Sequence, residues 1–507
     1  MIVLMSDCTT NAPPAADPLA PALRSLLEQL TGRRVRCIET HISWVLLDGE
    51  HAWKLKKPLR LGFIDATSAE TRGRLCHDEV RLNRRLAPDV YLDVVPIRGS
   101  RAAPQLDGDA PVIDHAVRMR QFANDAILDA RVAAGTLDGH QVGQLARRIA
   151  RFHESAAVAP DTYGQAETIA GDTTRVLDTL AELGTPAAAV AGLRAWCDER
   201  ARRLAPVFAA RRAAGRVRDG HGDLHLANTI VLGDEVTAFD CIEFDPALRM
   251  IDVFSDIAFT AMDLMAHGRA DLAGRFIDVW LEESGDYDGL PVLRYYLVYR
   301  ALVRAMTAAI RTAQRGDGAN PDPAGPDYLD LARRLITAPA PALVITHGLS
   351  GSGKSHYAAR FVETHGALRL RSDVIRKRLF GLTPQARSAD RHPAGIYGAD
   401  DTARTYARLL ELADLALADD WPVIVDASFL RAAQRRPFRE LASARGLSFG
   451  IVDCRAPLDV LRARIVARAA AGKDPSEADP AVLEWQLDRD EPFDADEAPF
   501  VLPVDTR

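Results

Sequence analysis

The sequence predicts a chain of two domains, the first of the α+β class and the second of the α/β class. Its 507 residues exceed the roughly 250 to 300 residues that one hydrophobic core usually serves. Strand-like segments come first and are followed by a mostly helical stretch up to about residue 314. From residue 343 onward, apolar strands alternate with helical stretches, which is typical of a parallel sheet with crossover helices. We therefore expect domains over 1–338 and 339–507.

Composition narrows the class of protein. The formal net charge of −7 provides no global positive field, so nucleic acid is an improbable partner. The six cysteines are scattered without CxxC spacing and indicate reduced thiols rather than disulfides or a zinc site. Because no uncharged apolar run approaches 18 residues, we expect a cytoplasmic protein without a membrane partner. The oligomeric state is left open.

The first domain is expected to consist of a small sheet-rich lobe over about 30–122 and a helical lobe over about 123–338. A loose leader over 6–21 precedes a first helix near Leu19 to Leu30. Two apolar runs between Val35 and Lys57 flank Asp48-Gly49, a dipeptide favoured in tight turns, and predict a β-hairpin. The further elements expected in this lobe are a helix over 69–86 and strands near 91–97 and 116–122.

Two breaks separate the domains. The segment 315–327 is rich in Pro, Gly and Asp, and 338–341 reads APAP. The strands expected beyond them lie within 343–348, 367–372, 422–428 and 448–454.

A glycine-rich phosphate-binding motif opens the second domain. The run GLSGSGKS over 348–355 satisfies GxxxxGK[ST] and stands between a predicted strand and a predicted helix. In such a loop the backbone N–H groups and the helix N-terminus bind phosphates. Lys354 would reach the β- and γ-phosphates, and Ser355 would bind Mg²⁺. The residues expected to bind ATP here are Gly348, Ser350, Gly351, Ser352, Gly353, Lys354 and Ser355.

Acidic and basic residues follow this motif at strand ends. Asp373 is expected to act as the catalytic base that takes the proton of an attacking hydroxyl, with Arg376 one helical turn further on. Asp426 ends an apolar strand and would bind Mg²⁺. Arg464 and Arg468 stand on a predicted lid helix and would neutralise phosphate charge, although a solvated helix face is the alternative. Residues 342–490 resemble the predicted-kinase relatives of polynucleotide kinase and zeta toxin.

A second constellation lies in the first domain. The sequence HGDLHLAN over 221–228 precedes an apolar strand, and a second strand then ends in Asp240. This spacing suits phosphoryl transfer, with a base at Asp223 and Mg²⁺ ligands at Asn228 and Asp240. The pattern resembles the aminoglycoside phosphotransferase family and its choline and sugar kinase relatives, which implies a protein-kinase-like fold and these same roles. Asp256 is expected to brace the loop.

A nucleotide-binding lysine is expected upstream. Lys54 is the preferred contact for the α- and β-phosphates because HAWK has the alternation of the kinase lysine strand. Glu79 on the next helix would pair with it. Lys56 lies on the same face and remains the alternative ligand.

These features together predict a kinase. Over nearly its full length the chain resembles bacterial fusions of an aminoglycoside-phosphotransferase-type domain with a P-loop kinase domain. The resemblance implies two Mg²⁺–ATP sites that transfer the γ-phosphoryl group to hydroxyl groups of small-molecule acceptors. One alternative is that one domain regulates the other as a nucleotide-binding module. Another is that the second domain acts on a nucleotide, a polynucleotide end or a sugar nucleotide.

Overall fold

The computed structural model describes residues 6–7, 17–61, 64–315, 325–337, 341–388, 395–472 and 474–507. It divides into two compact units. The first comprises Met1–Arg148, Phe152–Gln165 and Arg211–Asp263, and the second comprises Ile149–Arg151, Ala166–Ala210 and Leu264–Arg507. Much of the expected leader, of the loop 315–327 and of the break 338–341 lies outside the described residues. The boundary near residue 338 therefore stays a prediction.

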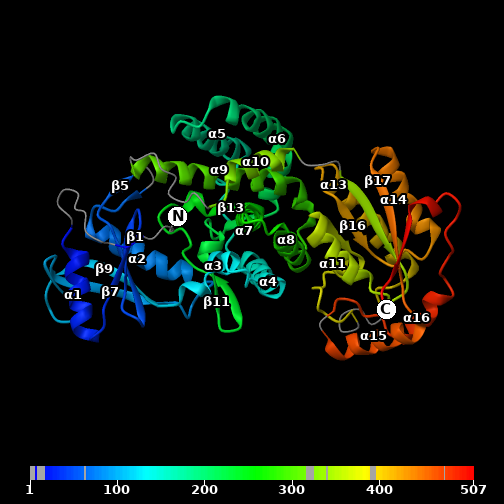
Figure 1. Ribbon diagram of the computed structural model, residues 1–507, viewed down its shortest axis with the longest axis horizontal. Helices are drawn as coiled ribbons and strands as arrows, with labels where there is room; N and C mark the ends of the chain where they lie inside the picture. The colour runs from blue at the N-terminus through cyan, green and yellow to red at the C-terminus, as the bar shows by residue number, and fades with distance from the viewer. Residues whose placement is uncertain are drawn as a thin grey trace. The chain divides into compact units, whose positions relative to one another are not determined.

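A seven-stranded antiparallel sheet forms the beginning of the first unit (Figure 1). Its strands, in spatial order, are β1 (Ser6–Asp7), β2 (Arg36–Glu39), β3 (Ser43–Leu47), β4 (His51–Lys56), β9 (Val112–Arg120), β7 (Tyr91–Ser100) and β8 (Ala103–Gln105). β3 and β4 form the expected hairpin around Asp48 and Gly49. The segment Val35 to Lys57 holds one strand more than expected, because β2 pairs with β3 as well. A two-stranded ribbon, β5 (Arg60–Leu61) and β6 (Ile64–Asp65), follows.

Helices α1 (Leu19–Thr31) and α2 (Ala69–Asn83) accompany this sheet. The apolar face of α1 places Leu23 and Leu27 in one core cluster with Leu46 and Ile97. α2 begins at Ser68, whose side chain accepts a hydrogen bond from the backbone N–H of Thr71 as an N-cap. It packs against β7 and β9 and carries Glu79 into the interior, fully buried.

The rest of the first unit supports a loop. The strand β10 (Val217–Asp219) pairs with β13 (Met250–Asp252), and β11 (Thr229–Leu232) pairs with β12 (Glu235–Ala238). Helices α3 (Leu128–Ala133), α4 (Gly139–Ser155) and α7 (Val253–Ala266) complete this region. The β12 strand ends at Ala238, so Asp240 lies two residues beyond it rather than at its end.

Helices form the first part of the second unit: α5 (Ala166–Glu182), α6 (Ala187–Ala213), α8 (Ala270–Ser284), α9 (Leu290–Arg315) and α10 (Tyr328–Ile336). Both α5 and α10 pack on α9. The Tyr295 hydroxyl of α9 lies 2.8 Å from that of Thr173, and its ring meets Phe208 edge-to-face. This long helical stretch agrees with the predicted helical pattern up to about residue 314.

A five-stranded parallel sheet follows within the same unit. Its order is β15 (Leu368–Arg371), β16 (Val423–Asp426), β14 (Ala342–His347), β17 (Ser448–Arg455) and β18 (Val501–Asp505). The first four confirm the predicted parallel sheet. β18 was not predicted, since its short VLPVD sequence contains a proline and is largely exposed at this sheet edge.

Crossover helices cover this sheet (Figure 1). α11 (Lys354–His365) and α13 (Ala399–Leu417) contact β14, β15 and β16, whereas α14 (Ala432–Ala444) contacts β14 and β17. The remaining helices are α12 (Ser372–Leu379), α15 (Leu458–Ala471) and α16 (Pro480–Leu487). The topology places the carboxyl ends of β14, β15 and β16 side by side, where an open parallel sheet binds its ligands.

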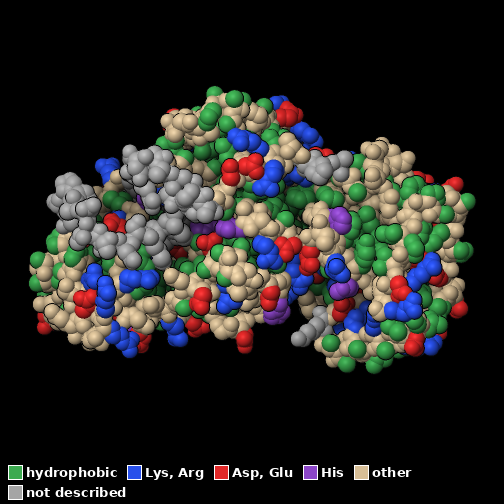
Figure 2. All heavy atoms as spheres, in the orientation of Figure 1, with side chains coloured by type: hydrophobic (Ala, Val, Ile, Leu, Met, Phe, Trp, Pro, Cys, Tyr) green, Lys and Arg blue, Asp and Glu red, His purple; other side chains and the backbone are tan. Residues whose placement is uncertain are grey.

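The surface is mixed in charge. On the face shown in Figure 2, acidic and basic side chains are interspersed. None of the helices in the described ranges has the length and apolar character needed to cross a bilayer.

Candidate active sites

The loop between β10 and β11 carries the first site. Asp223 and Asn228 are both buried, and the Asn228 side-chain amide donates to the Asp223 carbonyl at 2.9 Å and to its carboxylate at 3.0 Å. Asp256 of α7 accepts the backbone N–H groups of His221 at 2.7 Å and Gly222 at 3.0 Å. It therefore braces the loop, as expected from the sequence. Gly222 is required here, because a Cβ would meet the Leu248 carbonyl oxygen at 2.7 Å.

The His221 ring makes two hydrogen bonds to backbone groups of this region. Its Nε2 donates to the Phe239 carbonyl at 2.9 Å, so its Nδ1 accepts the Asp223 backbone N–H at 3.3 Å. Burial lowers the pKa of His221 to about 4, although the Asp256 carboxylate opposes the shift. The ring is thus neutral near pH 7 and positions Asp223.

Lysines and carboxylates meet beside this loop. Lys54 Nζ donates to Glu79 at 2.7 Å and to Asp240 at 2.6 Å, so the pairing expected for Glu79 is present. Lys56 donates to the other Glu79 oxygen at 2.7 Å and to Glu243. All five side chains are buried. The sequence pattern placed Lys54 and Lys56 on one face, but it gave no signal for Glu243.

Charge pairing outweighs burial in this cluster. Burial alone would raise the pKa of Glu79, but Lys54 and Lys56 hold that pKa at about 2. Burial alone would lower the pKa of Lys54, but Asp240, Glu79 and Glu243 raise it. Asp240 itself adopts a left-handed backbone with φ 63°, an unusual conformation for a residue other than glycine. Both lysines therefore stay charged beside the predicted metal ligand.

The first site fits a hard divalent cation. Among the described residues, nothing donates a hydrogen bond to the buried Asn228 Oδ1. The backbone N–H of Phe239 donates a hydrogen bond to the backbone carbonyl of Asn228. Asp240 is the next residue after Phe239, so this bond brings it close to Asn228. Carboxylate and amide oxygens are ligands that Mg²⁺ accepts. No group of three or more His, Cys, Asp or Glu side chains within the described residues could hold a metal by itself.

The glycine-rich loop of the second site runs from β14 into α11. Gly348 has φ 132°, and a Cβ there would meet the Cys454 carbonyl oxygen at 2.5 Å. Lys354 Nζ donates to the Leu349 carbonyl at 2.6 Å, within the loop. Burial lowers the pKa of Lys354, although Asp426 and Asp373 both oppose this shift. The loop, the lysine and the two carboxylates are thus gathered at the ends of β14, β15 and β16.

Asp426 ends β16 and faces Arg371 across the parallel pair. It is buried, and no described residue donates a hydrogen bond to its Oδ2. Asp373 lies in the first turn of α12, just beyond β15. This second buried oxygen without a donor again fits an Mg²⁺ ligand, alongside the Ser355 hydroxyl of the loop.

The arginines predicted to bind phosphate lie in different surroundings. Arg464 donates to the Gly351 carbonyl at 3.3 Å and thus touches the loop, whereas Arg468 donates to the Ala478 carbonyl at 3.0 Å. Arg376 is buried, donates to the Ile396 carbonyl at 3.0 Å and stacks on Tyr397. Only Arg464 of the three therefore contacts the phosphate loop.

Two cavities adjoin this loop. One of about 800 Å³ is lined by residues of α11, α15 and the C-terminal segment, including Gly353, His356, Tyr357, Arg464 and Thr506. Another of about 500 Å³ is lined by residues that include His347, Ser352, Asp453 and Phe493. The first is large enough for a nucleoside beside the phosphate loop.

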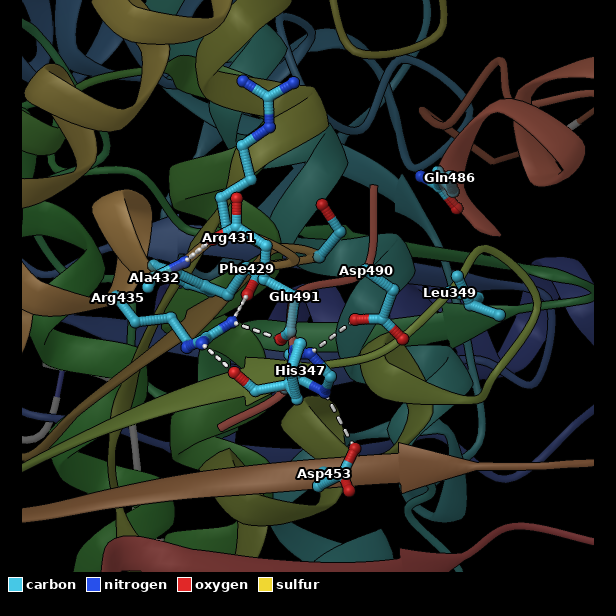
Figure 3. A network of polar contacts seen from close by, with 12 residues as sticks. His347, Leu349, Phe429, Arg431, Ala432, Arg435, Asp453, Gln486, Asp490 and Glu491 are labelled. Atoms are coloured by element: carbon cyan, nitrogen blue, oxygen red, sulfur yellow. Dashed lines mark hydrogen bonds and ion pairs between the residues drawn. The ribbon is translucent and has the colours of Figure 1, made fainter. Parts of the chain in front are cut away.

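The sequence did not predict a polar network that lies next to the phosphate loop (Figure 3). His347, at the end of β14, lies 2.8 Å from Asp453 and 3.2 Å from Asp490. Gln486 of α16 accepts the Ser350 backbone N–H at 2.7 Å. A histidine directly before the motif was the only available signal, since residues 486–490 belong to no recognisable pattern.

Comparison with known proteins gives a family model and three relatives. Residues 343–493 match the model described as an AAA domain. The uncharacterised proteins Rv2004c and MT2060 of Mycobacterium tuberculosis and Mb2027c of Mycobacterium bovis are each 32% identical over 448 residues, which is 86% of either chain.

Solved structures are similar at a lower level. A choline/ethanolamine kinase family protein from Mesorhizobium loti is 14% identical, covering 63% of this chain and 92% of its own, with a TM-score of 0.36. An APS kinase from Mycobacterium tuberculosis is 26% identical, covering 33% and 90%, with a TM-score of 0.23.

Proposed function

The chain belongs to the same family as these mycobacterial proteins, and we propose that it is an ATP- and Mg²⁺-dependent phosphotransferase with two separate sites. Each site would pass the γ-phosphoryl group of ATP to a hydroxyl group of a small molecule. The observation that carries the proposal is shared by both sites. Each has a buried side-chain oxygen without a hydrogen-bond donor among the described residues, on Asn228 and on Asp426, where Mg²⁺ is expected.

In the first site Asp223 is the base. Its carboxylate takes the proton of the acceptor hydroxyl while that oxygen bonds to the γ-phosphorus and the bond to the leaving ADP breaks. Asn228 and His221 hold Asp223 in place through the side-chain and backbone bonds described above. Lys54 carries its charge to the α- and β-phosphates, with Lys56 as the alternative. Asn228 and Asp240 would hold Mg²⁺, and the bound ion would neutralise phosphate charge.

In the second site the loop 348–355 holds the phosphates. Lys354 would leave the Leu349 carbonyl to contact the β- and γ-phosphates, and Asp373 would act as base. Ser355 and Asp426 would hold Mg²⁺. The cavity beside Gly353 and Arg464 would take the nucleoside, and Arg464 already lies against the loop. Arg376 and Arg468 would approach the phosphates only after side-chain rearrangement.

A screen of hydroxyl acceptors tests the proposal, with ATP as donor and radiolabel transfer as the readout. Asp223→Asn is expected to abolish transfer to one class of acceptor and to leave transfer by the second site unchanged. Lys354→Ala is expected to do the reverse. Asp234→Asn, the same chemical change at an exposed turn, is the matched control and should behave as wild type.

Either of two results would contradict the proposal. If Lys354→Ala lowered transfer to the acceptor that depends on Asp223, one unit would regulate the other. If both variants kept full transfer to every acceptor and unchanged ATP turnover, neither assignment would stand.

A further inference from the structure

Arg369 of β15 is held by a helix that precedes the predicted domain boundary. Its guanidinium donates to both oxygens of Asp278, at 3.1 and 2.8 Å, and to Glu282 at 2.8 Å. Both carboxylates belong to α8. The same guanidinium also reaches the Ser355 carbonyl at 3.4 Å, so it links α8 to the phosphate loop.

Arg371, two residues further along β15, lies in the same cluster. It donates to Asp474 at 2.7 Å and lies 3.8 Å from Glu282. Its Nε is buried and donates to no described residue.

The two guanidinium groups flank the oxygen expected to bind Mg²⁺. Arg369 Nη1 and Arg371 Nε each lie 3.8 Å from Asp426 Oδ2, which is too far for a hydrogen bond. An arginine that moved closer by less than 1 Å would form that bond and occupy the oxygen. Arg369 instead bonds Asp278 and Glu282, and Arg371 bonds Asp474.

The charges explain why these attachments matter. Four carboxylates, those of Asp278, Glu282, Asp426 and Asp474, lie within 4 Å of the two guanidinium groups. Without Asp278 and Glu282, Asp426 would be the remaining carboxylate within 4 Å of the Arg369 guanidinium among the described residues, whereas Arg371 would keep Asp474. A buried guanidinium pays a large desolvation cost unless it is paired, so it would turn to Asp426.

We infer that Asp278 and Glu282 are positioning residues of the P-loop site, which hold Arg369 away from Asp426 so that the free Asp426 oxygen can bind a divalent cation. The inference rests on the proposed function of this site. It assigns to α8, within the stretch predicted as the first domain, a part in the chemistry of the second.

The test measures Mg²⁺-dependent binding of a non-hydrolysable ATP analogue by calorimetry. The full chain is used, and the component that disappears in Lys354→Ala belongs to the P-loop site. The double variant Asp278→Asn/Glu282→Gln is expected to raise the Mg²⁺ concentration for half-maximal binding at that site by about fivefold or more. Analogue affinity at saturating Mg²⁺ should change far less. The conservative pair Asp278→Glu/Glu282→Asp keeps both charges and should restore most of the Mg²⁺ affinity.

A matched control separates charge from packing. Arg275 of α8 and Glu363 of α11 form another ion pair, at 3.3 Å and partly exposed, which does not involve Asp426. Glu363→Gln removes a different contact of α8, the one with α11, and should leave the Mg²⁺ dependence unchanged. A shift in Glu363→Gln equal to that of the double variant would overturn the inference, because loosened helix packing would then explain both.

Removing the arginine provides the reverse test. In Arg369→Met, the further change Asp278→Asn should have little effect on the Mg²⁺ dependence, because the competitor is gone; a full effect would overturn the inference. If the double variant fails to fold, the single change Glu282→Gln gives the same readout. Should Lys354→Ala remove no binding component, the proposed function itself fails. Should it remove one while the α8 variants match wild type, only this inference fails.

Discussion

At the scale of single residues, His221 connects protonation to the geometry of Asp223. Its folded-state pKa of about 4 lies below the ordinary value of 6.5. When the pH falls from 6.5 towards 4, the unfolded chain therefore takes up a proton that the folded chain refuses. The contribution of His221 to the unfolding free energy is therefore fully present above pH 6.5 and is lost as the pH falls from 6.5 to 4. Protonation of Nδ1 would also break its bond from the Asp223 backbone N–H.

We predict that this group contributes up to about 3 kcal/mol of pH-dependent stability between pH 6.5 and pH 4. Denaturant unfolding of wild type and His221→Gln at several pH values measures it. The variant should show a flatter pH profile in this window, whatever its stability at pH 7. Parallel profiles would show that His221 does not titrate as described.

Asn228 has two functions in one side chain. Its amide nitrogen positions Asp223, and its amide oxygen is buried without a donor. Asn228→Ala should raise the Mg²⁺ concentration needed for transfer by the first site and lower kcat by about 100-fold or more. Initial rates over a Mg²⁺ series measure both effects. A variant with unchanged Mg²⁺ dependence would remove Asn228 from the metal site.

At the scale of elements, β4 and α2 are joined by buried charges. Lys56 of β4 shares Glu79 with Lys54 and also bonds Glu243. Lys56→Met would leave carboxylates buried with one cation fewer, and we expect a loss of about 3 to 5 kcal/mol in unfolding free energy. Adding Glu243→Gln should recover part of it, since the excess charge is removed.

Lys57→Met is the control for this change. Lys57 pairs with Glu39, which is half-exposed, at 2.6 Å, and its loss should cost about 1 kcal/mol or less. Urea unfolding of wild type, Lys56→Met, Glu243→Gln and the double variant completes a double-mutant cycle, with Lys57→Met measured alongside. Equal losses for Lys56→Met and Lys57→Met would contradict the importance of the buried network.

The phosphate loop and the helix after it allow a second comparison. Gly348 and Gly366 both have positive φ, but only Gly348 is crowded, whereas nothing lies within 4 Å of a Cβ at Gly366. Gly348→Ala should distort the loop and weaken ATP-analogue binding at this site by more than about tenfold. Gly366→Ala should bind normally and lose only about 1 kcal/mol of stability. Calorimetric titration compares them, and normal binding by Gly348→Ala would show that the loop tolerates a side chain.

At the scale of the whole molecule, the candidate sites lie in different compact units. We predict that the wild-type chain binds two molecules of a non-hydrolysable ATP analogue in the presence of Mg²⁺. Lys354→Ala should bind one, while Asp223→Asn should still bind two, because the base does not hold the nucleotide. Equilibrium dialysis gives these ratios, and a single binding site in wild type would contradict the two-site proposal.

The local elements and the motifs could be predicted from neighbouring residues alone. Period-2 and period-3.6 apolar patterns predicted α1, the β3–β4 hairpin and four parallel strands, because each depends on neighbouring residues. The spacing of HGDLHLAN and of the loop 348–355 identified the candidate residues for the same reason. Edge strand β18 escaped because it is short, exposed and contains proline.

Which distant charges meet depends on tertiary packing and could not be predicted from local patterns. Glu243, Gln486 and the α8 pair Asp278 and Glu282 reach their partners across 87 to 187 residues, and no local pattern records such contacts. Their positions follow from how helices and strands pack, since burial obliges each charge to find a partner wherever the fold provides one. That Asn228 and Asp426 each have a buried oxygen without a donor among the described residues became visible only in the folded structure.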